Sequence, residues 1–526
     1  MNASLQPSNT AEATTAFVGA LAALLPPAKI LTELSERKLY ENDVFFWEGV
    51  RLPDVVVQPT QTSEISAIAT LAHKHAMPII VRGGGMSYTK GYLRDAGPSV
   101  LLDLTKLNAV IQINPTGRYA IVGAGCTWLT LMRAAAEHGL VPSLVSPPMS
   151  GSHSTVGGAA SQNLPGTMAG ILGLEVVLAN GTVVRTGSWG RKGEASPFYR
   201  NFGPDLTGLF LGDCGAFGIK TAVVVHLRRK PKALGYGSFA FKSYEDLAAT
   251  MIELSQLDHL VTRLGLDPYE SRMAPQVAWK QGVKTLTEVV RTGDSFFGGL
   301  TESVKMALTG RDFMADAGWT LHVKSEGVNQ AAADAGIEEA RAMIMKRAEK
   351  ELPPILLRAA EATGPTVRKF LGKNGERWVA TNSMFEITRA VEIATKVQSF
   401  FAERAAEIKK HNVTVSYVTS CSQFHFMCEP CFTWNDSVSE LHLRALPGDE
   451  AEKFRNNPAQ PDTRKFVQTL REQFRDLVYE LGAVHVQFAK FYPYQEALLP
   501  ATAELAQQLK TLLDPDGLMN PGNLGF

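Results

Sequence analysis

The chain has 526 residues, 45% hydrophobic and 20% charged, an ordinary globular composition with room for two or three domains. Lys+Arg and Asp+Glu both number 52, so the formal net charge is zero. Proteins that bind nucleic acid or an anionic membrane usually carry excess basic residues, so the balance argues against both partners. The five cysteines are few and odd in number, which favours a reducing compartment, the cytoplasm, over a disulfide framework.

The N-terminal apolar run, residues 16–25, is too short to cross a bilayer, and no Lys or Arg precedes it as in a signal peptide. We expect an amphipathic helix that packs on the body of the protein or on a partner subunit. No other stretch of the sequence is apolar enough to span a membrane. Residues 1–49 are predicted to be a helical lead-in.

Short strands and turn glycines follow as far as residue 231. Residues 55–57 predict a strand, and residues 129–138 predict a helix. Another helix is predicted to start at Thr62 or Ser63, with apolar residues at helical spacing: Ile65, Ile68, Ala69 and Ala72. The pattern indicates an α+β domain over residues 50–231.

The most distinctive stretch follows residues 78–81, which predict a short buried strand. It contains Gly83, Gly84 and Gly85 in a row, followed by Ser87. Glycine lets main-chain atoms approach a ligand closely, and successive N–H groups in such a turn form a nest for an anion. The loop is therefore predicted to cradle a phosphate. It matches neither the P-loop nor the G-x-G-x-x-G pattern, and alone it is equally compatible with a tight turn that binds nothing.

Further glycine-rich blocks follow in order. They cover residues 120–128, 154–163, 173–187 and 211–221, and the chain ends with Leu-Asp-Pro-Asp-Gly-Leu-Met-Asn-Pro-Gly at residues 513–522. In this order and spacing, the blocks resemble the FAD-binding domain of the vanillyl-alcohol oxidase / p-cresol methylhydroxylase flavoprotein superfamily. The resemblance is strong over residues 50–231 and at the C-terminus, and loose in between.

The resemblance implies FAD as the cofactor. The pyrophosphate of FAD needs backbone N–H donors, which the loop of residues 82–88 and the Gly157-Gly158 turn are expected to supply. Residues 155–166 and 215–219 are expected to line the flavin ring. The expected cofactor-binding residues are Arg82, Gly83, Gly84, Gly85, Met86, Ser87, Tyr88, Gly125, Thr155, Gly157, Gly158, Ser161, Asn163, Gly215, Gly218, Ile219 and Asn520.

The sequence departs from some relatives at the positions that link the flavin covalently. Those relatives carry a linking histidine directly after the first glycines, where this chain has Met86, which cannot form the bond. Others carry a cysteine shortly before the Val-Gly-Gly turn, where residues 148–154 contain none; His153 lies nearby but does not match that pattern. Non-covalent FAD is therefore favoured, and a link from a cap-domain His or Tyr is left open.

From residue 232 the composition shifts, and strands separated by helices predict an antiparallel sheet covered by helices. Expected strands are 236–241, 261–266, 318–324 and 413–434, expected helices are 244–257, 329–351 and 464–482, and residues 353–410 are expected to be rich in helix. The resemblance implies that residues 232–490 form a cap or substrate domain. It also implies that residues 491–526 return to the FAD domain.

The segment of residues 420–434 contains His425 and a Cys428-x-x-Cys431 pair, which invites a metal or redox interpretation. A structural zinc site usually needs two such pairs, and the sequence has no second one, so no metal site is predicted. Aromatic residues alternate here with period two, and we expect them to face the substrate pocket. These are Phe424, Phe426, Phe432 and Trp434.

The candidate catalytic residues are His425, His485, Tyr492 and Arg377. His485 and Tyr492 precede the C-terminal return, where the resemblance places acid–base or substrate-binding residues. A carbinol carbon gives up hydride readily only as its hydroxyl proton departs, and histidine has a suitable unperturbed pKa for the base. Arg377 is a candidate anchor for an anionic substrate, and Arg377 or the Glu429 carboxylate is the alternative if neither histidine acts.

The favoured function is an FAD-dependent oxidase or dehydrogenase acting on an alcohol or para-hydroxybenzylic carbon of an aromatic small molecule. Its electron acceptor would be O2, a redox protein or a quinone, and a homo-oligomer such as a homodimer is expected. One alternative is a D-2-hydroxy acid dehydrogenase of the lactate or glycolate type, although the Gly-His-x-Gly-Asp-Gly-Asn metal stretch of such relatives is absent. Others are a non-redox transferase resembling alkyl-dihydroxyacetonephosphate synthase and a flavin-binding protein without turnover.

Overall fold

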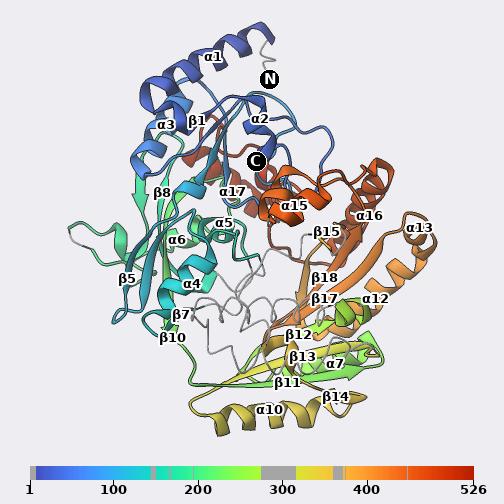
Figure 1. Cartoon of the computed structure of the whole chain (residues 1–526). Coiled ribbons are helices and arrows are strands. Elements are labelled where there is room, and N and C mark those ends of the chain that lie inside the picture. The colour runs from blue at the N-terminus through green and yellow to red at the C-terminus, as the bar shows by residue number, and fades with distance from the viewer. Residues whose placement is uncertain are drawn as a thin grey trace.

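The structure, a computed structural model, describes residues 7–143, 150–164, 168–193, 195–273, 316–358, 371–372, 375–446 and 448–526. Three sheets organise these residues (Figure 1). Two smaller sheets are built from the first half of the chain, and one large sheet is built from the second half. The mixture of helices with mainly antiparallel sheets confirms the predicted α+β class.

The first sheet has the strand order β1-β2-β4-β3. Its strands are β1 (Ile30–Leu31), β2 (Val55–Val57), β3 (Ile79–Arg82) and β4 (Val100–Asp103). The strands β2, β4 and β3 are parallel, since the helix α3 (Thr62–Lys74) connects β2 to β3. The helix α1 (Pro7–Leu24) buries Phe17 and Leu21 in the same core, so the N-terminal apolar run packs on the body of the protein.

The second sheet has the antiparallel order β5-β6-β10-β8-β9, and β7 also pairs with β10. Its strands are β5 (Val110–Asn114), β6 (Tyr119–Gly123), β7 (Leu140–Pro142), β8 (Ile171–Val177), β9 (Val183–Arg185) and β10 (Ile219–Arg229). The short helices of this region are α4 (Trp128–Ala136), α5 (Val156–Ser161) and α6 (Leu206–Leu209). Helices α4 and α5 bury Trp128, Leu131 and Val156 against the sheet.

The third sheet, the cap sheet, is antiparallel throughout with the order β14-β11-β13-β12-β17-β18-β15, and β16 also pairs with β18. Its strands are β11 (Ala233–Phe241), β12 (Leu260–Leu266), β13 (Trp319–Gly327), β14 (Lys350–Leu352), β15 (Arg377–Ala380), β16 (Ser383–Glu386), β17 (Thr414–Cys421) and β18 (His425–Trp434). This confirms the predicted antiparallel sheet.

Helices cover the face of the cap sheet that points away from the first two sheets, as Figure 1 shows for α7 and α10. The described helices of this region are α7 (Tyr244–Leu254), α10 (Gln330–Ile344), α12 (Ala390–Glu403), α13 (Ala405–Lys410), α14 (Glu440–Ala445), α15 (Gly448–Phe454) and α16 (Pro461–Glu480). Two predictions were wrong in detail. The helix expected over residues 329–351 ends at Ile344, because residues 350–352 pair with β11, and residues 377–386 form two strands in a stretch expected to be helical.

The C-terminal segment returns to the first half of the chain after α17 (Pro500–Leu513). Ile79 of β3 exchanges backbone hydrogen bonds with this segment, donating to the Leu518 carbonyl and accepting from the Asn520 N–H. The Asn520 side chain accepts a hydrogen bond from the Val81 N–H and donates one to the Gly215 carbonyl, both at 2.8 Å. The return therefore ties the two smaller sheets together. Among the described helices, none combines the length and apolar character needed to cross a membrane.

Candidate functional site

The glycine loop, residues 83–88, leaves β3 with its backbone N–H groups unused. Within the described part of the chain, these six N–H groups donate no hydrogen bond. Gly85 has a φ of +77°, the left-handed region that glycine enters without strain. Successive free N–H groups around such a residue form a concave anion site. The loop therefore offers the donors that a pyrophosphate needs.

Arg82 lies beneath this loop, 4% exposed, and most of its guanidinium contacts are within the chain, although its buried Nε has no partner among the described residues. It packs over the rings of Tyr40 and Tyr92, at 5.0 and 5.4 Å, and lies 3.8 Å from the Asp103 carboxylate. Its Nη1 also donates to the Gly83 carbonyl. These contacts make Arg82 a support of the loop, and its direct contact with FAD stays a prediction.

The segment before α5 packs directly on the glycine loop. A Cβ atom added to Gly84 would overlap the His153 carbonyl, and one added to Gly83 would overlap Thr155 Oγ1. Close backbone packing is therefore one reason for glycine at both positions. Ser154 in the same segment has a buried Oγ without a partner among the described residues. Such an atom is costly unless a ligand or water bonds it, so it is a candidate contact for a bound cofactor.

The Gly157-Gly158 turn corrects one expectation about the cofactor site. The Gly157 N–H donates to the Ala124 carbonyl at 3.0 Å, and the Gly158 N–H donates to the side chain of the N-cap Thr155 at 3.1 Å. These donors are occupied, so the turn does not offer them to a phosphate. Glycine is needed at 157 because a Cβ there would lie 2.6 Å from the Ala124 Cβ.

The remaining expected cofactor residues hold loops together around the same region. The Ser161 carbonyl accepts from the Cys214 N–H, and Asn163, at a φ of +51°, packs against Gly212. Gly215 has a φ of +75° and contacts Asn520, whose amide is fully used in the bridge described above. The other three, Gly125, Gly218 and Ile219, occupy tight backbone packing or the core. These residues shape the site, and their direct contact with FAD stays a prediction.

A small cluster joins the glycine loop to the cap sheet. The Tyr88 hydroxyl donates to Glu429 Oε1 of β18 at 3.3 Å. The Tyr88 ring meets the Trp378 ring of β15 edge to face, with centroids 6.1 Å apart. Burial and the nearby Glu429 charge raise the pKa of Tyr88 well above its usual value, so this phenol is neutral and can donate. The cluster places two aromatic rings and a carboxylate beside the predicted phosphate loop.

The aromatic alternation in β18 was assigned to the wrong face. Phe426 and Phe432 point into the core of the cap, where Phe432 packs on Phe401 of α12, and Trp434 packs on Phe45 of the N-terminal segment. Glu429 lies on the opposite face of β18, since odd and even residues alternate, and it is this face that meets the glycine loop. Phe424 lies outside the strand and is 71% exposed. All five cysteines are buried, and none of them forms a disulfide within the described part of the chain.

His485, Tyr492 and Asn382 form a second polar group beside Tyr88. His485 Nδ1 lies 2.9 Å from the Asn382 carbonyl, so Nδ1 carries the proton and Nε2 carries the lone pair. The imidazole stacks on the Tyr492 ring at 4.2 Å, and the Tyr492 hydroxyl accepts from the Asn382 N–H at 2.8 Å. The structure thus brings His485 and Tyr492 together, as predicted.

Two buried atoms of this group have no partner among the described residues, His485 Nε2 and Asn382 Nδ2. His485 is 3% exposed, and burial lowers its pKa to about 4, so it is neutral near pH 7. Burial also raises the pKa of Tyr492. An unpaired acceptor and an unpaired donor in a buried place indicate room for a polar ligand.

The other two catalytic candidates lie elsewhere. His425 begins β18, four residues before Glu429, and its contacts are local: Nδ1 lies 2.8 Å from Ser422 Oγ and the ring meets Phe424. Arg377 is fully buried, and its guanidinium donates to the carbonyls of Ser437 and Val44 at 2.8 and 2.6 Å. It joins two segments of backbone, which argues against its predicted role as an anchor for an anionic substrate.

Sequence reasoning gave no role to Asn382 or Arg471 and named Glu429 only as a fallback. Asn382 connects His485 to Tyr492 through its backbone, and no side-chain spacing signals that function. Glu429 lies between Cys428 and Pro430, in a stretch whose cysteines and more distant aromatic residues drew the interpretation instead. Only the pairing of β18 with its neighbours shows which residues face the glycine loop.

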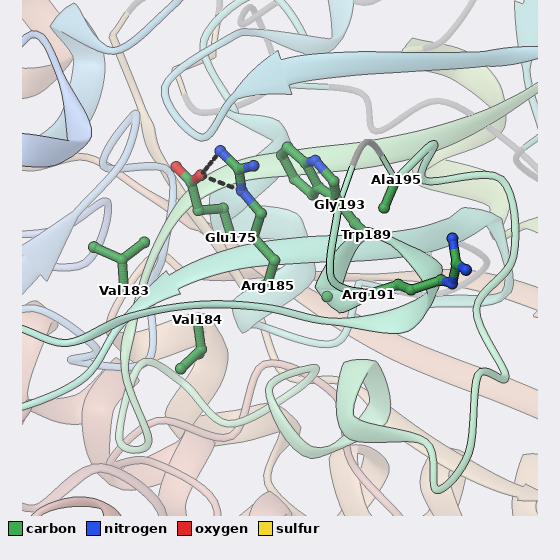
Figure 2. Close-up of a pocket in the computed structure, with 9 residues that line it drawn as sticks. Glu175, Val183, Val184, Arg185, Trp189, Arg191, Gly193 and Ala195 are labelled. Atoms are coloured by element: carbon green, nitrogen blue, oxygen red, sulfur yellow. Dashed lines mark hydrogen bonds and ion pairs between the residues drawn. The ribbon is translucent and has the colours of Figure 1, made fainter.

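A separate pocket of about 580 Å³ lies on the β8–β9 hairpin and shares no residue with the predicted sites (Figure 2). Its buried carboxylate, Glu175, accepts hydrogen bonds from Arg185, Thr62 and Thr221. These partners satisfy Glu175 within the chain. Over the residues that the structure describes, no group of three or more His, Cys, Asp and Glu side chains is arranged to hold a metal ion.

Comparisons with known proteins agree with this geometry. Residues 53–187 match the family model for an FAD binding domain. The chain is 36% identical over 189 residues to glycolate oxidase subunit GlcD of Bacillus subtilis, covering 34% of this chain and 38% of that protein. It is 30% identical over 214 residues to the mitochondrial D-lactate dehydrogenase (cytochrome) 1 of Saccharomyces cerevisiae, covering 39% and 35%. The matches thus span less than half the length of these curated relatives.

Solved structures share the fold over 99% of this chain. p-Cresol methylhydroxylase with substrate bound has a TM-score of 0.71 at 19% identity, covering 98% of that chain. 4-Ethylphenol oxidase from Gulosibacter chungangensis has a TM-score of 0.70 at 19% identity, also covering 98%. Alkyldihydroxyacetonephosphate synthase has a TM-score of 0.65 at 15% identity and is covered over 86% of its length.

The free N–H groups of the glycine loop and the orphaned Ser154 hydroxyl fit a flavin nucleotide, and FAD is the cofactor of the matched domain. The match over residues 53–187 therefore identifies an FAD-binding domain in this chain, and the chain shares its fold with p-cresol methylhydroxylase and 4-ethylphenol oxidase.

Proposed function

We propose that the chain is an FAD-dependent oxidoreductase that oxidises a CH–OH group or a para-hydroxybenzylic carbon of an aromatic small molecule. The observation that carries the proposal is the cluster of Tyr88, Trp378 and Glu429 beside the glycine loop. When bound, FAD supplies the hydride acceptor. The protein then has to bind the substrate, orient it and remove a proton.

Aromatic side chains supply the binding surface in this proposal. The Tyr88 and Trp378 rings meet edge to face, an arrangement that a third ring can extend. The Tyr492 hydroxyl already accepts from Asn382, so its own proton is available to a phenolic or alcoholic oxygen. These groups suit an apolar ring with one polar end.

His485 is the proposed base. Its Nδ1–H is held by the Asn382 carbonyl, which leaves the Nε2 lone pair free to accept the hydroxyl proton of an alcohol. The Glu429 carboxylate is the alternative, since it already accepts a hydrogen bond from Tyr88. His425 is not retained for this role, because its contacts lie in the turn before β18.

A D-2-hydroxy acid is the second candidate substrate, and the similarity to glycolate oxidase and D-lactate dehydrogenase favours it. Such a substrate needs a cation for its carboxylate. Arg377, the expected anchor, is instead bound to two backbone carbonyls. We therefore rank the aromatic substrate first. The fold shared with alkyldihydroxyacetonephosphate synthase keeps a transferase without net redox change as a further alternative.

Anaerobic addition of substrates to the purified flavoprotein tests the proposal. Bleaching of the yellow flavin by a 4-alkylphenol or a 4-hydroxybenzyl alcohol, and not by D-lactate or glycolate, is the expected result. Bleaching by the hydroxy acids alone selects the second candidate. A flavin that no redox substrate bleaches contradicts the oxidoreductase proposal and leaves the transferase.

The bond between protein and FAD is part of the same proposal. Met86 follows the glycines at the position of a linking histidine, so we propose that FAD is held without a covalent bond. Acid precipitation is expected to leave the yellow colour in the supernatant. Flavin that stays with the precipitated protein would show a covalent link.

A further inference from the structure

An N-terminal strap, residues 40–47, lies between the glycine loop and the cap. The Val44 N–H donates to the Ser87 carbonyl at 2.9 Å, and the buried Asp43 carboxylate accepts from the Lys90 N–H at 2.9 Å. Both bonds hold the strap to the glycine loop and the residues directly after it. The strap therefore moves with the predicted cofactor loop.

Three buried arginines of the cap attach to this strap. Arg377 of β15 donates to the Val44 carbonyl. Arg464 and Arg471, both on α16, lie over aromatic rings of the strap: Arg464 over Phe46 at 3.8 Å, and Arg471 over Phe45 at 4.7 Å. Stacked guanidinium groups hold a fixed plane, so these contacts fix the cap relative to the loop.

Arg471 differs from the other two because it also bonds both walls of the proposed substrate pocket. Its Nη2 donates to the Tyr88 carbonyl at 3.1 Å and to the Ala380 carbonyl at 3.3 Å, and its Nε donates to Thr381 Oγ1 at 3.3 Å. Tyr88 is the aromatic residue of the loop wall. Residues 380–381 lead directly into Asn382, which holds His485 and Tyr492.

We propose that Arg471 is a positioning residue that sets the separation between Tyr88 and the Asn382–His485–Tyr492 group. The kinetic part of this inference rests on the proposed function, whereas the structural part does not. Arg471 is fully buried, and its hydrogen bonds to Tyr88, Ala380 and Thr381 all go to neutral acceptors, so the charge is buried at a high cost in desolvation. A planar fork with donors at fixed angles is what a rigid link between two backbone segments requires.

Arg464 provides a matched control on the same helix. It lies seven residues before Arg471, two helical turns away, and it is also buried and stacked on a strap ring. Its guanidinium bonds Asp436 at 2.7 and 2.8 Å and forms no hydrogen bond to Tyr88 or to residues 380–382, all of which the structure describes. Losing Arg464 should therefore weaken the attachment of the cap without changing the pocket walls directly.

Hydrogen exchange measured by mass spectrometry tests the structural part. Arg471→Met is expected to speed amide exchange by about tenfold at two separate places, the hydrogen-bonded amides of Thr89 and Lys90 and those of residues 380–386, because both places lose the same anchor. Arg471→Lys keeps the positive charge but not the planar guanidinium, so its exchange rates should lie between those of wild type and Arg471→Met. Arg464→Met should leave both segments unchanged. Unchanged exchange in Arg471→Met, or equal effects of the two methionine variants, would overturn the proposal.

The anaerobic rate of flavin reduction at saturating substrate tests the kinetic part. Arg471→Met is expected to lower this rate by about 10- to 100-fold with normal FAD content, as a displaced pocket wall would. Arg471→Lys should recover part of the loss, and Arg464→Met should stay within about threefold of wild type. A wild-type flavin that no substrate reduces contradicts the proposed function alone, and the exchange comparison still decides the role of Arg471.

Discussion

The two walls of the candidate site are built from different kinds of groups. The loop wall, residues 83–88, presents backbone N–H groups, and its shape depends on the absence of side chains at Gly83 and Gly84. The cap wall presents side chains, Glu429 from a strand and His485 with Tyr492 from the C-terminal return. The loop wall should therefore be sensitive to any added Cβ atom. The cap wall should be sensitive to single functional groups and to pH.

The largest expected effect is on the cap wall. His485→Ala should lower the rate of flavin reduction by about 10²- to 10⁴-fold, because the proposed general base is removed. Stopped-flow absorbance at saturating substrate measures this rate. His425→Ala is the control and should remain within about threefold of wild type, far below the effect of a general base. Equal rates for both variants would move the base to Glu429, which Glu429→Gln then tests.

The loop wall should respond most strongly at Gly84. Gly84→Val places a branched side chain against the His153 carbonyl and forces the loop away from the segment before α5. Strain of about 3 kcal/mol corresponds to FAD binding about 100-fold weaker. The ratio of flavin to protein absorbance after gel filtration measures the loss, with circular dichroism as the control for folding. Full FAD content in this variant would contradict the prediction that the glycine loop binds FAD.

The free energy of unfolding should depend on pH through His485 of the cap wall. The pKa of His485 is lowered from 6.5 to about 4 by burial, so the unfolded chain binds a proton there more readily than the folded chain. The contribution of neutral His485 to the free energy of unfolding is complete above pH 6.5 and is lost as the pH falls towards 4. The total loss is about 3 kcal/mol.

Urea unfolding at pH 7 and pH 4 measures this loss of unfolding free energy. His485→Asn should lose less stability than wild type between the two pH values, because no imidazole is left to protonate. His322 is the comparison, since burial lowers its pKa to about 3 and His322→Asn should also flatten the profile. Identical pH profiles for wild type and His485→Asn would contradict the neutral, buried imidazole.

The smallest expected effects are on stability, and they should differ between the two glycines of the Gly157-Gly158 turn. Gly157→Ala brings its Cβ to 2.6 Å from the Ala124 Cβ and should cost about 1–3 kcal/mol of unfolding free energy. Gly158→Ala meets only Thr155 Oγ1, at 3.0 Å, and gains helix propensity, so it should cost less than about 1 kcal/mol. Thermal unfolding measures both. If Gly158→Ala lost FAD while its stability stayed unchanged, the Gly157-Gly158 turn would have to contact FAD after all.

Local sequence patterns were sufficient to predict most helices and strands and to single out the glycine loop. Apolar spacing in α3 predicted the buried Ile65, Ile68, Ala69 and Ala72, and alternating strands predicted an antiparallel cap sheet. The three glycines after β3 predicted a loop with successive free N–H groups, and the described residues accept no hydrogen bond from the backbone N–H groups of residues 83–88. These features depend on residues close together in the chain, so a local pattern is sufficient to identify them.

The tertiary structure alone decided which groups face the site. Both faces of β18 are covered, one by helices and one by the glycine loop, so period-two alternation could not tell the pocket face from the core face. The donors of Gly157 and Gly158 are occupied by Ala124 and Thr155, and Arg377 is occupied by Val44 and Ser437. A hydrogen-bond donor is available only if no distant segment reaches it first, and only the folded chain shows which segments do.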